Sequence, residues 1–524
     1  MYNYCLLISV LFIQIFLSSP VIAQTGENEP VHSDKDSKVL YVSGSFPYLI
    51  DKTFSVISKT SYNSGFHDLL FTSEESSSGI YTFRGNNQRN SPVLGTLSGK
   101  PVKIKKDWVF NTSLDTVKGI YGRWGGGAGW TGQPLYVEWS TEELSTINGI
   151  YPEFVNRNTS LREIIQVSLS GKVYFLEAET GKPTRNPLDI NNPIKGTPSI
   201  DGKNRRFLLV GQGIKNRDVF GWRIFDLRKN VLLHTERMPS SFAPKGWGAS
   251  DASPLIEPVS GTFIWPTESG VIYRGSLYNE KLPPSEQYKY SIKGHPRQGI
   301  ESSPSAYGNL GYFTDNAGNT FCLDLRTMKP RWHFFNTDDS DASPVIDVEN
   351  NIPFVFIGNE VDQQGPEGKA YLRKLNGLTG KLEWEYERHC YSVTQPKTNN
   401  GGMLTTPAIG RKKAEGLIWT VFSRVDANSR GSFVCLNIAD GKVKYEIPLR
   451  SYSWASPIAL YDPEGFAYVY FTDVTGHIYL INGISGEIIF KNKFSNVFES
   501  SPVAIGNRII QPARGNKIFS FIVE

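Results

Sequence analysis

The chain has 524 residues, enough for about three or four ordinary domains or for one large repetitive architecture. Its 49 glycines, 31 prolines and 13% aromatic residues, beside only four methionines, indicate many short strands joined by tight turns and exclude a coiled coil or a mainly helical protein. Basic and acidic residues nearly balance, 55 against 51, so the chain has no strong net field that would attract nucleic acid or an anionic bilayer.

The chain begins with a segment typical of an export signal. Residues 1–23 contain no charged side chain, and the apolar run over residues 5–17 is too short to span a bilayer comfortably. Ala23 supplies the small residue that signal peptidase needs at the cleaved bond. We therefore expect a signal peptide over residues 1–23 and a protein exported to the periplasm or the cell exterior. Because no Lys or Arg precedes the apolar run, an uncleaved membrane anchor is the alternative.

Residues 24–78 are interpreted as a polar, flexible leader and an N-terminal extension to which the sequence assigns no structure. From residue 79 to the C-terminus the chain repeats a short signature, in which a small or polar residue precedes Ser or Thr and then Pro. The prolines of this signature are Pro198, Pro254, Pro304, Pro344, Pro407, Pro457 and Pro502, and Pro134 belongs to a degenerate first copy. The steps between them average about 53 residues, close to the period of propeller blades once loop insertions are allowed. Eight copies over residues 79–524 predict an all-β, eight-bladed β-propeller.

Each repeat contains further turns at similar places. A Gly-centred hairpin follows the second strand, as at Gly171 and Gly270, and the alternating residues beyond it predict a half-buried strand. A second Gly turn precedes the fourth strand, as at Gly380 and Gly441, and an aromatic residue follows it, Trp384 or Tyr445. We expect four-stranded antiparallel blades whose gaps are filled by these rings.

The end of the chain predicts how the ring closes. After Pro502 only three strand-like runs remain, over residues 503–505, 508–512 and 517–523. The segment 102–111, which carries Trp108, is the expected donor of the missing fourth strand, because such closure removes exposed sheet edges. Two independent β-domains of four repeats each are the alternative, although no Pro/Ser-rich linker separates the halves.

Cleavage of the signal would remove Cys5 and leave Cys322, Cys390 and Cys435. Three widely spaced cysteines form neither a disulfide framework nor a metal ligand set. Cys322 and Cys435 occupy matching places in similar strands, where we expect buried thiols.

The repeats resemble the pyrroloquinoline quinone (PQQ) repeat superfamily, the quinoprotein-dehydrogenase-like propellers that include the BamB-type outer-membrane assembly scaffold. The resemblance is carried by Thr379-Gly380-Lys381 with Trp384, and in part by residues 326–332. Residues 82–86, 129–134 and 338–344 are similar to secreted bacterial PQQ-like propeller proteins of unestablished function. The resemblance implies either a binding and scaffold role or a quinoprotein oxidoreductase.

The cysteines argue against a quinoprotein oxidoreductase. Quinoprotein alcohol dehydrogenases of this fold typically carry a disulfide of adjacent cysteines over the quinone and a Ca²⁺ held by Glu, Asn and Asp beside a catalytic Asp. No two cysteines are adjacent here, and no haem-binding Cys-x-x-Cys-His is present. We therefore expect no PQQ and assign no catalytic residue; a PQQ- or Ca-dependent enzyme acting on alcohols or sugars is the alternative function.

Residues just ahead of the innermost strands should line one mouth of the central channel. The position three before each repeat proline is occupied, in order, by Thr131, Lys195, Asp251, Glu301, Asp341, Leu404, Trp454 and Glu499. Four of the eight are carboxylates, tryptophans offer flat walls, and Arg123, His295 and Arg297 are cations near this mouth. The predicted ligand-binding residues are Arg123, Trp130, Trp247, Asp251, Glu301, Asp341, Trp454 and Glu499. A Ca²⁺ ion would use Asp251, Glu301 and Asp341, since hard cations prefer carboxylate oxygens. The alternative is that these residues are solvated or cap backbone amides.

These features together favour an exported binding or scaffold protein over an enzyme. We expect it to act as a monomer and to recognise a protein or glycan of the cell envelope or exterior through its funnel and loops.

Overall fold

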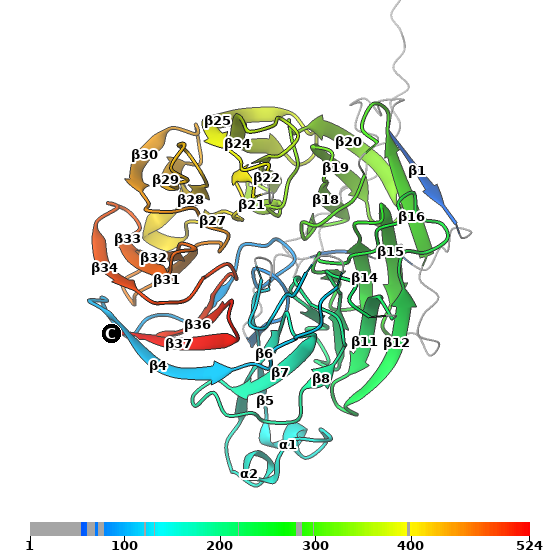
Figure 1. Ribbon diagram of the computed structural model, residues 1–524, viewed down its shortest axis with the longest axis vertical. Coiled ribbons are helices and arrows are strands. Elements are labelled where there is room, and N and C mark those ends of the chain that lie inside the picture. The colour runs from blue at the N-terminus through cyan, green and yellow to red at the C-terminus, as the bar shows by residue number, and fades with distance from the viewer. Residues whose placement is uncertain are drawn as a thin grey trace, which may run out of the picture.

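The computed structural model describes residues 54–59, 66, 69–71, 78–119, 122–129, 132–217, 219–278, 286–296, 298–395 and 399–524. Eight mainly antiparallel sheets of four or five strands stand radially around one axis (Figure 1). This arrangement confirms the eight-bladed β-propeller and rules out two separate β-domains. The predicted signal peptide and most of the predicted leader lie outside the described residues.

The first four blades follow the order of the repeats. Blade 1 contains β2 (Gly79–Ile80), β5 (Leu135–Trp139), β6 (Leu161–Val167), β7 (Lys172–Glu177) and β8 (Leu188–Asp189). Blade 2 contains β9 (Ser199–Ile200), β10 (Phe207–Val210), β11 (Gly221–Asp226) and β12 (Val231–Arg237). Blade 3 contains β13 (Leu255–Ile256), β14 (Thr262–Pro266), β15 (Val271–Ser276), β16 (Glu286–Ile292) and β1 (Phe54–Ser58). Blade 4 contains β17 (Ser305–Tyr307), β18 (Leu310–Thr314), β19 (Asn319–Asp324) and β20 (Lys329–Phe335).

The second four complete the ring. Blade 5 contains β21 (Val345–Glu349), β22 (Ile352–Gly358), β24 (Glu367–Asn376) and β25 (Leu382–Tyr391), and a small sheet of β23 (Glu360–Val361) and β26 (Gly401–Gly402) accompanies it. Blade 6 contains β27 (Ala408–Ile409), β28 (Leu417–Phe422), β29 (Ser432–Asn437) and β30 (Val443–Pro448). Blade 7 contains β31 (Ile458–Tyr461), β32 (Ala467–Thr472), β33 (His477–Asn482) and β34 (Ile488–Lys493). Blade 8 contains β3 (Val93–Leu94), β35 (Val503–Ile505), β36 (Arg508–Ala513), β37 (Lys517–Val523) and β4 (Ile104–Asn111).

Burial along the strands explains their sequence patterns. The middle strands are buried on both faces because each blade is packed between two neighbours, so β10 (FLLV) and most of β29 (SFVCLN) are hydrophobic runs. The outer strands face solvent on one side, and β25 alternates half-buried and exposed residues along most of its length. The short inner strands that follow the repeat prolines surround the axis.

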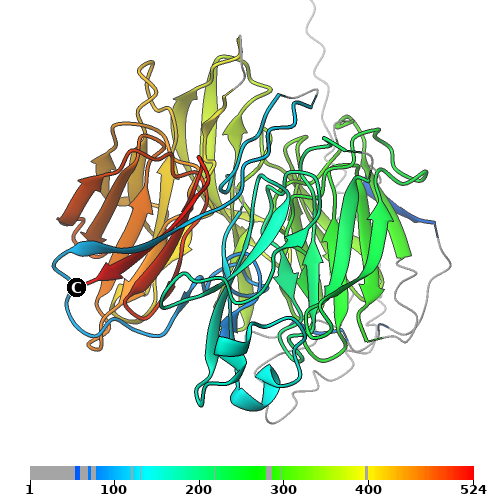
Figure 2. The same ribbon diagram turned by 60° about the horizontal axis from the view of Figure 1, so that its bottom comes forward.

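Two short helices interrupt blade 1 between β5 and β6. Helix α1 (Thr141–Leu144) begins with a capping box of Ser140 and Glu143, and α2 (Pro152–Val155) begins with Pro152. Leu144 and Phe154 bury their side chains in the core of blades 1 and 2. Figure 2 shows both helices projecting beyond the ends of the strands. A 3₁₀ helix, η2 (Lys412–Ala414), follows β27. Over the described ranges we find no helix with the length and apolarity needed to cross a bilayer.

The predicted closure of the ring is confirmed. Strand β4 pairs antiparallel with β37, from Asn111 opposite Lys517 to Ile104 opposite Val523, and completes blade 8. In Figure 1 the blue β4 lies beside the red β37. Three blades also carry a fifth strand that the four-stranded expectation did not include: β2 in blade 1, β1 in blade 3 and β3 in blade 8. Part of the unassigned N-terminal extension, β1, thus covers the edge strand β16.

Aromatic rings fill the gaps between blades, as predicted. Trp332 of blade 4 lies over Gly380 of blade 5 and donates its Nε1–H to the Gly377 carbonyl over 2.7 Å. The same contact recurs between Trp384 and Gly441, between Tyr445 and Gly486, and between Trp108 of the closing strand and Gly181. Each glycine has a positive φ, and a Cβ there would lie within 2.7 Å of the ring. The Gly turn is therefore required both for the backbone conformation and for the ring above it.

The Ser/Thr of the repeat signature links neighbouring blades. The Ser303 hydroxyl accepts the Ser253 N–H (2.9 Å), and the Ser343 hydroxyl accepts the Ser303 N–H (2.9 Å). The chain of bonds continues through Thr406, Ser456 and Ser501, and a bond between Gln133 N–H and Thr197 belongs to the same series. Because each hydroxyl satisfies a buried amide of the preceding blade, the signature recurs once per blade.

Residues 81–92, which we call the plug, cross the axis inside this ring. The carbonyls of Tyr81, Asn87, Gln88 and Pro92 accept N–H groups from inner strands of blades 2, 4, 5 and 8, two residues beyond each repeat proline. The chain enters the plug from β2 and leaves it through β3, and it appears as the blue segment at the centre of Figure 1. The plug therefore closes the central channel and lies deeper along the axis than the residues that precede the prolines.

Two buried arginines hold the plug in place. Arg84 donates to the carbonyls of Pro457 (2.7 Å) and Pro407 (3.2 Å), and Arg89 donates to those of Pro304 (2.8 Å) and Ser253 (2.9 Å). Burial lowers the pKa of each guanidinium to about 9, so both remain charged at neutral pH. The plug thus places two cations against carbonyl groups of four different blades.

Candidate binding funnel

A cavity of about 300 Å³ opens at the end of the channel where the inner strands begin. It is lined by five residues of the predicted mouth positions and ligand set, namely Lys195, Glu301, Asp341, Trp454 and Glu499. It is also lined by residues that the sequence analysis did not select: Trp124, Asp339, Glu360, Asn399, Asn400, Tyr452 and Arg514. Residues three before the repeat prolines therefore do converge, as the propeller geometry requires. We call this cavity the funnel.

An ammonium group is built into one part of the funnel. Lys195 Nζ lies 2.5 Å from Asp251 Oδ2 and 3.8 Å from Glu301 Oε2. Although burial opposes the charge, the two carboxylates raise the pKa of Lys195 well above its usual value. Glu268, from the β14–β15 hairpin, offers an oxygen within 4.8 Å of oxygens of Asp251 and Glu301. Burial and the nearby Glu301 raise the pKa of the Glu268 carboxyl well above its usual value. Three carboxyl groups thus share one ammonium.

A second part of the funnel has carboxyl groups but no cation. Asp339, Asp341 and Glu360 line it together, and across the described part of the chain none of the three forms an ion pair. Glu360 is 1% exposed; its Oε2 accepts Asn400 Nδ2–H (2.9 Å), whereas no amide, hydroxyl or basic group of the described residues donates to its buried Oε1, which has only the Asp341 carboxyl beside it. A buried carboxyl oxygen whose neighbour is another carboxyl can accept a donor from a ligand.

The protonation of this second group follows from its crowding. Burial and the neighbouring Asp341 raise the pKa values of Asp339 and Glu360 well above the usual range. Burial and the charge of Glu301 raise the pKa of Asp341 to about 7. The group therefore holds protons at neutral pH, and a cation that binds there would displace them.

The rim of the funnel is aromatic. Tyr452 accepts Asn399 Nδ2–H at its hydroxyl (2.8 Å), and Trp454 lines the cavity two residues further along. Arg514 pairs with Glu499 (3.0 Å) and stacks over the ring of Trp124 at 5.6 Å, so its charge is engaged at the rim. Flat rings beside carboxylates are a common environment for a cationic side chain and its apolar stem.

The other predicted residues lie elsewhere. Trp247 does not line the cavity, but it donates its Nε1–H to Glu268 (2.7 Å) and so supports the carboxyl cluster from behind. Arg123 is exposed and is not among the residues that line the funnel. His295 packs on Phe335 at 4.7 Å, at the outer strand of blade 4. Trp130, Thr131 and Arg297 lie outside the described residues.

Several funnel carboxyls were missed because they do not precede a repeat proline. Glu268 belongs to a hairpin between two strands, and Glu360 begins the short strand β23. Asp339 lies two residues before Asp341, within the segment 338–344 whose resemblance to secreted propellers was noted. Asp339 could have been found because it lies two residues from the mouth position Asp341. Glu268 could have been found because its hairpin, between β14 and β15, faces the same end of the blade as the mouth positions.

Comparison with known proteins supports the fold. No family model matches the sequence, and no curated protein matches it. Among solved structures, the quinohemoprotein alcohol dehydrogenase ADHIIG from Pseudomonas putida HK5 has a TM-score of 0.53 at 9% identity, over 86% of this chain and 80% of that one. BamB from Moraxella catarrhalis has a TM-score of 0.47 at 16% identity, over 69% and 93% of the two chains. A europium-containing methanol dehydrogenase has a TM-score of 0.43 at 12% identity, over 85% and 98%.

Proposed function

Starting from an eight-bladed propeller of the PQQ-like, BamB-like repeat fold, we propose that this protein is an exported binding protein whose funnel receives a lysine or arginine side chain of a partner protein. The observation that carries the proposal is the group of Asp339, Asp341 and Glu360, three carboxyls that line one cavity and have no ion-pair partner among the described residues. Clustered carboxyls of this kind attract a cation, because its charge removes their mutual repulsion.

The charge balance of the funnel supports a cationic ligand. Seven carboxyl groups lie in or beside it: Asp251, Glu268, Glu301, Asp339, Asp341, Glu360 and Glu499. The two basic residues that line it, Lys195 and Arg514, are already paired with Asp251 and Glu499. The carboxyls outnumber these two cations, and those that hold protons at neutral pH would ionise around an incoming cation, so the space would favour a cation over an anion.

Lys195 shows that the site chemistry suits an ammonium. Its Nζ lies at the distance of a strong ion pair from Asp251 (2.5 Å) and farther from Glu301 (3.8 Å), and its stem is buried. An incoming lysine would find the same kind of partners at Asp341 and Glu360, and Trp454 and Tyr452 would cover its stem. Ring contacts of this kind are worth about 0.5–2 kcal/mol each.

The quinoprotein alternative fits the residues poorly. PQQ carries three carboxylates, which the acidic funnel would repel. The three described cysteines are buried, unpaired and in separate blades, so the disulfide expected from the resemblance has no counterpart there. A Ca²⁺ ion at Asp251, Glu268 and Glu301 would have to displace the Lys195 ammonium, which lies 2.5 Å from Asp251. We therefore derive no chemical step through a quinone or a metal.

The proposal is tested by calorimetric titration of the mature protein with trilysine, and with triglutamine and triglutamate as neutral and anionic probes. We expect trilysine to bind and the other two to bind at least about tenfold more weakly, the effect of one charge-assisted contact. Asp341→Asn and Glu360→Gln keep the side-chain shape and should each weaken trilysine about tenfold. Glu383→Gln, an exposed residue of β25, is the matched control and should change nothing.

Two results would overturn the proposal. One is equal binding of trilysine and triglutamine, or trilysine binding that both funnel variants leave unchanged. The other is a shifted quinone absorbance with PQQ and Ca²⁺ together with dye reduction by an alcohol or aldose, lost in Asp251→Ala, which would establish the oxidoreductase instead.

A further inference from the structure

A second cavity, of about 900 Å³, lies at the opposite end of the blades from the funnel. Its walls come from the connections that follow β9, β11 and β15, and from the segment between α1 and α2 of blade 1. Inner strands start at the funnel, and in an antiparallel blade the connections after the first and third strands lie at the far end. We call this cavity the basic pocket. It spans blades 1, 2 and 3 and shares no residue with the funnel.

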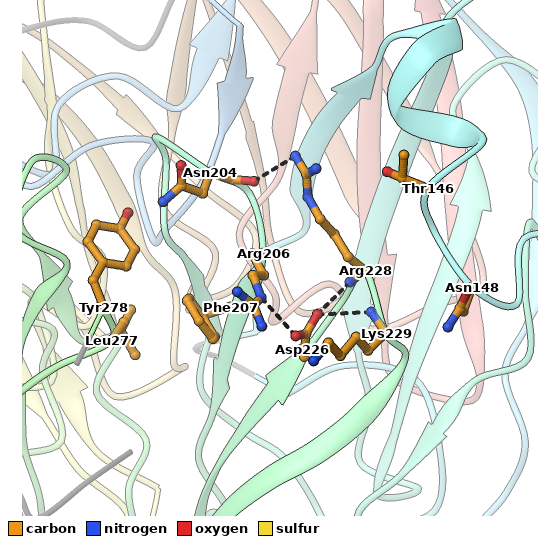
Figure 3. A pocket seen from close by; sticks show the side chains of 10 residues that line it. All are labelled: Thr146, Asn148, Asn204, Arg206, Phe207, Asp226, Arg228, Lys229, Leu277 and Tyr278. Carbon is orange, nitrogen blue, oxygen red and sulfur yellow. Dashed lines mark hydrogen bonds and ion pairs between the residues drawn. The ribbon is translucent and has the colours of Figure 1, made fainter. Parts of the chain in front are cut away.

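The basic pocket presents cations with unused donors. Figure 3 shows the Arg206 guanidinium and the backbone nitrogens of Arg228 and Lys229 at the carboxylate of Asp226, and the Arg228 guanidinium directed away from it toward the Asn204 carbonyl. Asp226 is fully buried and accepts Arg206 Nε–H (2.8 Å) and the backbone N–H groups of Arg228 and Lys229. Over the described ranges Lys229 Nζ makes no hydrogen bond or ion pair, the terminal nitrogens of Arg206 make no hydrogen bond although its guanidinium pairs with Asp226, and the buried Nε of Arg228 has no hydrogen-bond partner.

The neighbouring carboxylates do not cancel these charges. Glu143, at the rim, is engaged by Arg205 (2.5 Å) and Arg228 (3.1 Å). Asp201, behind the pocket, accepts the Arg206 N–H (2.7 Å) and the Tyr278 hydroxyl (3.1 Å), and burial raises its pKa to about 6. Four basic groups, Arg205, Arg206, Arg228 and Lys229, thus lie beside three carboxylates, and the Lys229 ammonium pairs with none of the described ones. The pocket would accept an anion.

The remaining walls suit a sugar ring. Phe207 and Tyr278 contact each other at 6.2 Å, and the Arg206 guanidinium packs over Phe207 at 4.9 Å. Asn148 and Asn204 line the cavity as well. Figure 3 places Tyr278 on one side and Asn148 on the other, with Arg206 and Lys229 between them. Aromatic rings beside amides and cations can cover the apolar face of a pyranose and bind its hydroxyls and carboxylate.

The site is also preformed and roomy. The Asn148 N–H donates to the Arg228 carbonyl (2.7 Å), so the helical insertion of blade 1 is anchored to blade 2. Its volume lies at the upper end of the ~300–1,000 Å³ typical of ligand pockets, which leaves space for more than one sugar ring. The backbone N–H groups of Arg206, Arg228 and Lys229 are all used within the protein, so an extended peptide would find no strand edge here.

We propose that the basic pocket binds an acidic glycan whose carboxylates are carried on hexuronate rings. This site is independent of the funnel and would let one disc hold a cationic protein group at one end and an anionic glycan at the other. The cations would bind the carboxylates, and the half-buried ring of Tyr278, backed by the buried Phe207, would cover a ring face.

The test is a titration of the mature protein with trigalacturonate, with neutral galactotriose and hexaglutamate as comparison probes. We expect trigalacturonate to bind more tightly than either, with an affinity that falls as NaCl rises from about 0.05 M to about 0.5 M. Lys229→Gln should weaken it about five- to tenfold. Asn148→Asp should weaken it similarly by adding a like charge at an exposed position that the fold does not depend on. Lys493→Gln, an exposed lysine of blade 7, is the control.

Each other outcome overturns the inference. Tighter binding of hexaglutamate would assign the pocket to an acidic peptide, and equal binding of galactotriose would remove the role of the cations. Binding that neither Lys229→Gln nor Asn148→Asp weakens would place the glycan elsewhere. Asp341→Asn must leave trigalacturonate affinity unchanged, so this test fails or succeeds separately from that of the funnel.

Discussion

Arg89 is the clearest point at which to test the plug. It is 0% exposed, and its guanidinium donates to the carbonyls of Pro304 and Ser253 and, within the plug, to the Thr82 hydroxyl (2.6 Å) and the carbonyls of Phe83 (3.1 Å) and Asn86 (3.4 Å). Arg89→Met keeps a long side chain of related shape and removes every donor. The variant would leave two buried carbonyls of blades 3 and 4 without their partner.

The expected loss can be bounded from these contacts. A hydrogen bond to a charged group contributes about 1.5–3 kcal/mol, so the five bonds would suggest a much larger loss if they simply added. Burial opposes the charge, as the lowered pKa of Arg89 shows, and this cost disappears with the guanidinium. Removing one partner of a buried charged network typically costs about 3–5 kcal/mol, and we expect Arg89→Met to lose free energy of unfolding in that range.

Urea unfolding followed by tryptophan fluorescence measures this loss. Arg430→Met is the matched control, because Arg430 is exposed and pairs with Asp426 on a surface loop, where the loss should stay below about 1 kcal/mol. An Arg89→Met protein within about 0.5 kcal/mol of the wild type would refute the reasoning, since it would mean that the guanidinium does not hold blades 3 and 4 to the plug.

Three further predictions concern the ring, the blade gaps and the funnel. Ser303→Ala leaves the Ser253 N–H without its acceptor and should cost about 1–3 kcal/mol in urea unfolding, whereas Ser303→Thr, the residue found at this place in other blades, should cost less. Gly380→Ala meets Trp332 at 2.7 Å at a φ of 73° and should lower the melting temperature in calorimetry; no change would argue against the packed gap. The pKa of Asp341 is raised to about 7, so its stabilising contribution is complete below pH 4 and is lost as pH rises through 7. The shift corresponds to at most about 4 kcal/mol, and less because the cavity admits solvent. Asp341→Asn should flatten the pH dependence of thermal unfolding between pH 4 and 8, and trilysine binding to the wild type should strengthen as pH rises through 7; an unchanged pH profile in the variant would contradict the assignment.

Most of the fold could be predicted because every blade needs the same few residues. The hydroxyl of Ser303 satisfies an amide of the preceding blade, and Gly380 makes room for Trp332, so both recur with the blade period. The closing strand could be found because Trp108 of blade 8, like Trp384 of blade 5, fills the gap to the next blade and donates its Nε1–H to a carbonyl there. These requirements are local to a blade and its neighbour, and they therefore leave a periodic pattern.

The plug left no such pattern. The segment around Arg84 and Arg89 is rich in polar residues, as a solvated surface loop would be. The main partners of both arginines are backbone carbonyls, which any residue supplies. In the funnel, the position before the repeat prolines identified Lys195, Glu301 and Asp341, whose distance from the axis the propeller geometry fixes. Glu268 and Glu360 reach the same cavity from other connections, whose direction depends on blade twist and loop conformation.

The position of the plug in the chain has a consequence for biosynthesis. Residues 81–92 leave the ribosome before any complete blade, yet Arg84 binds carbonyls 323 and 373 residues further on. Until those distant segments are translated, both guanidiniums remain hydrated, and a truncated nascent chain contains the plug without the complete ring of blades that should surround it. Contacts of such sequence separation slow folding, so we expect a late, concerted assembly step and a need for protection from aggregation before it.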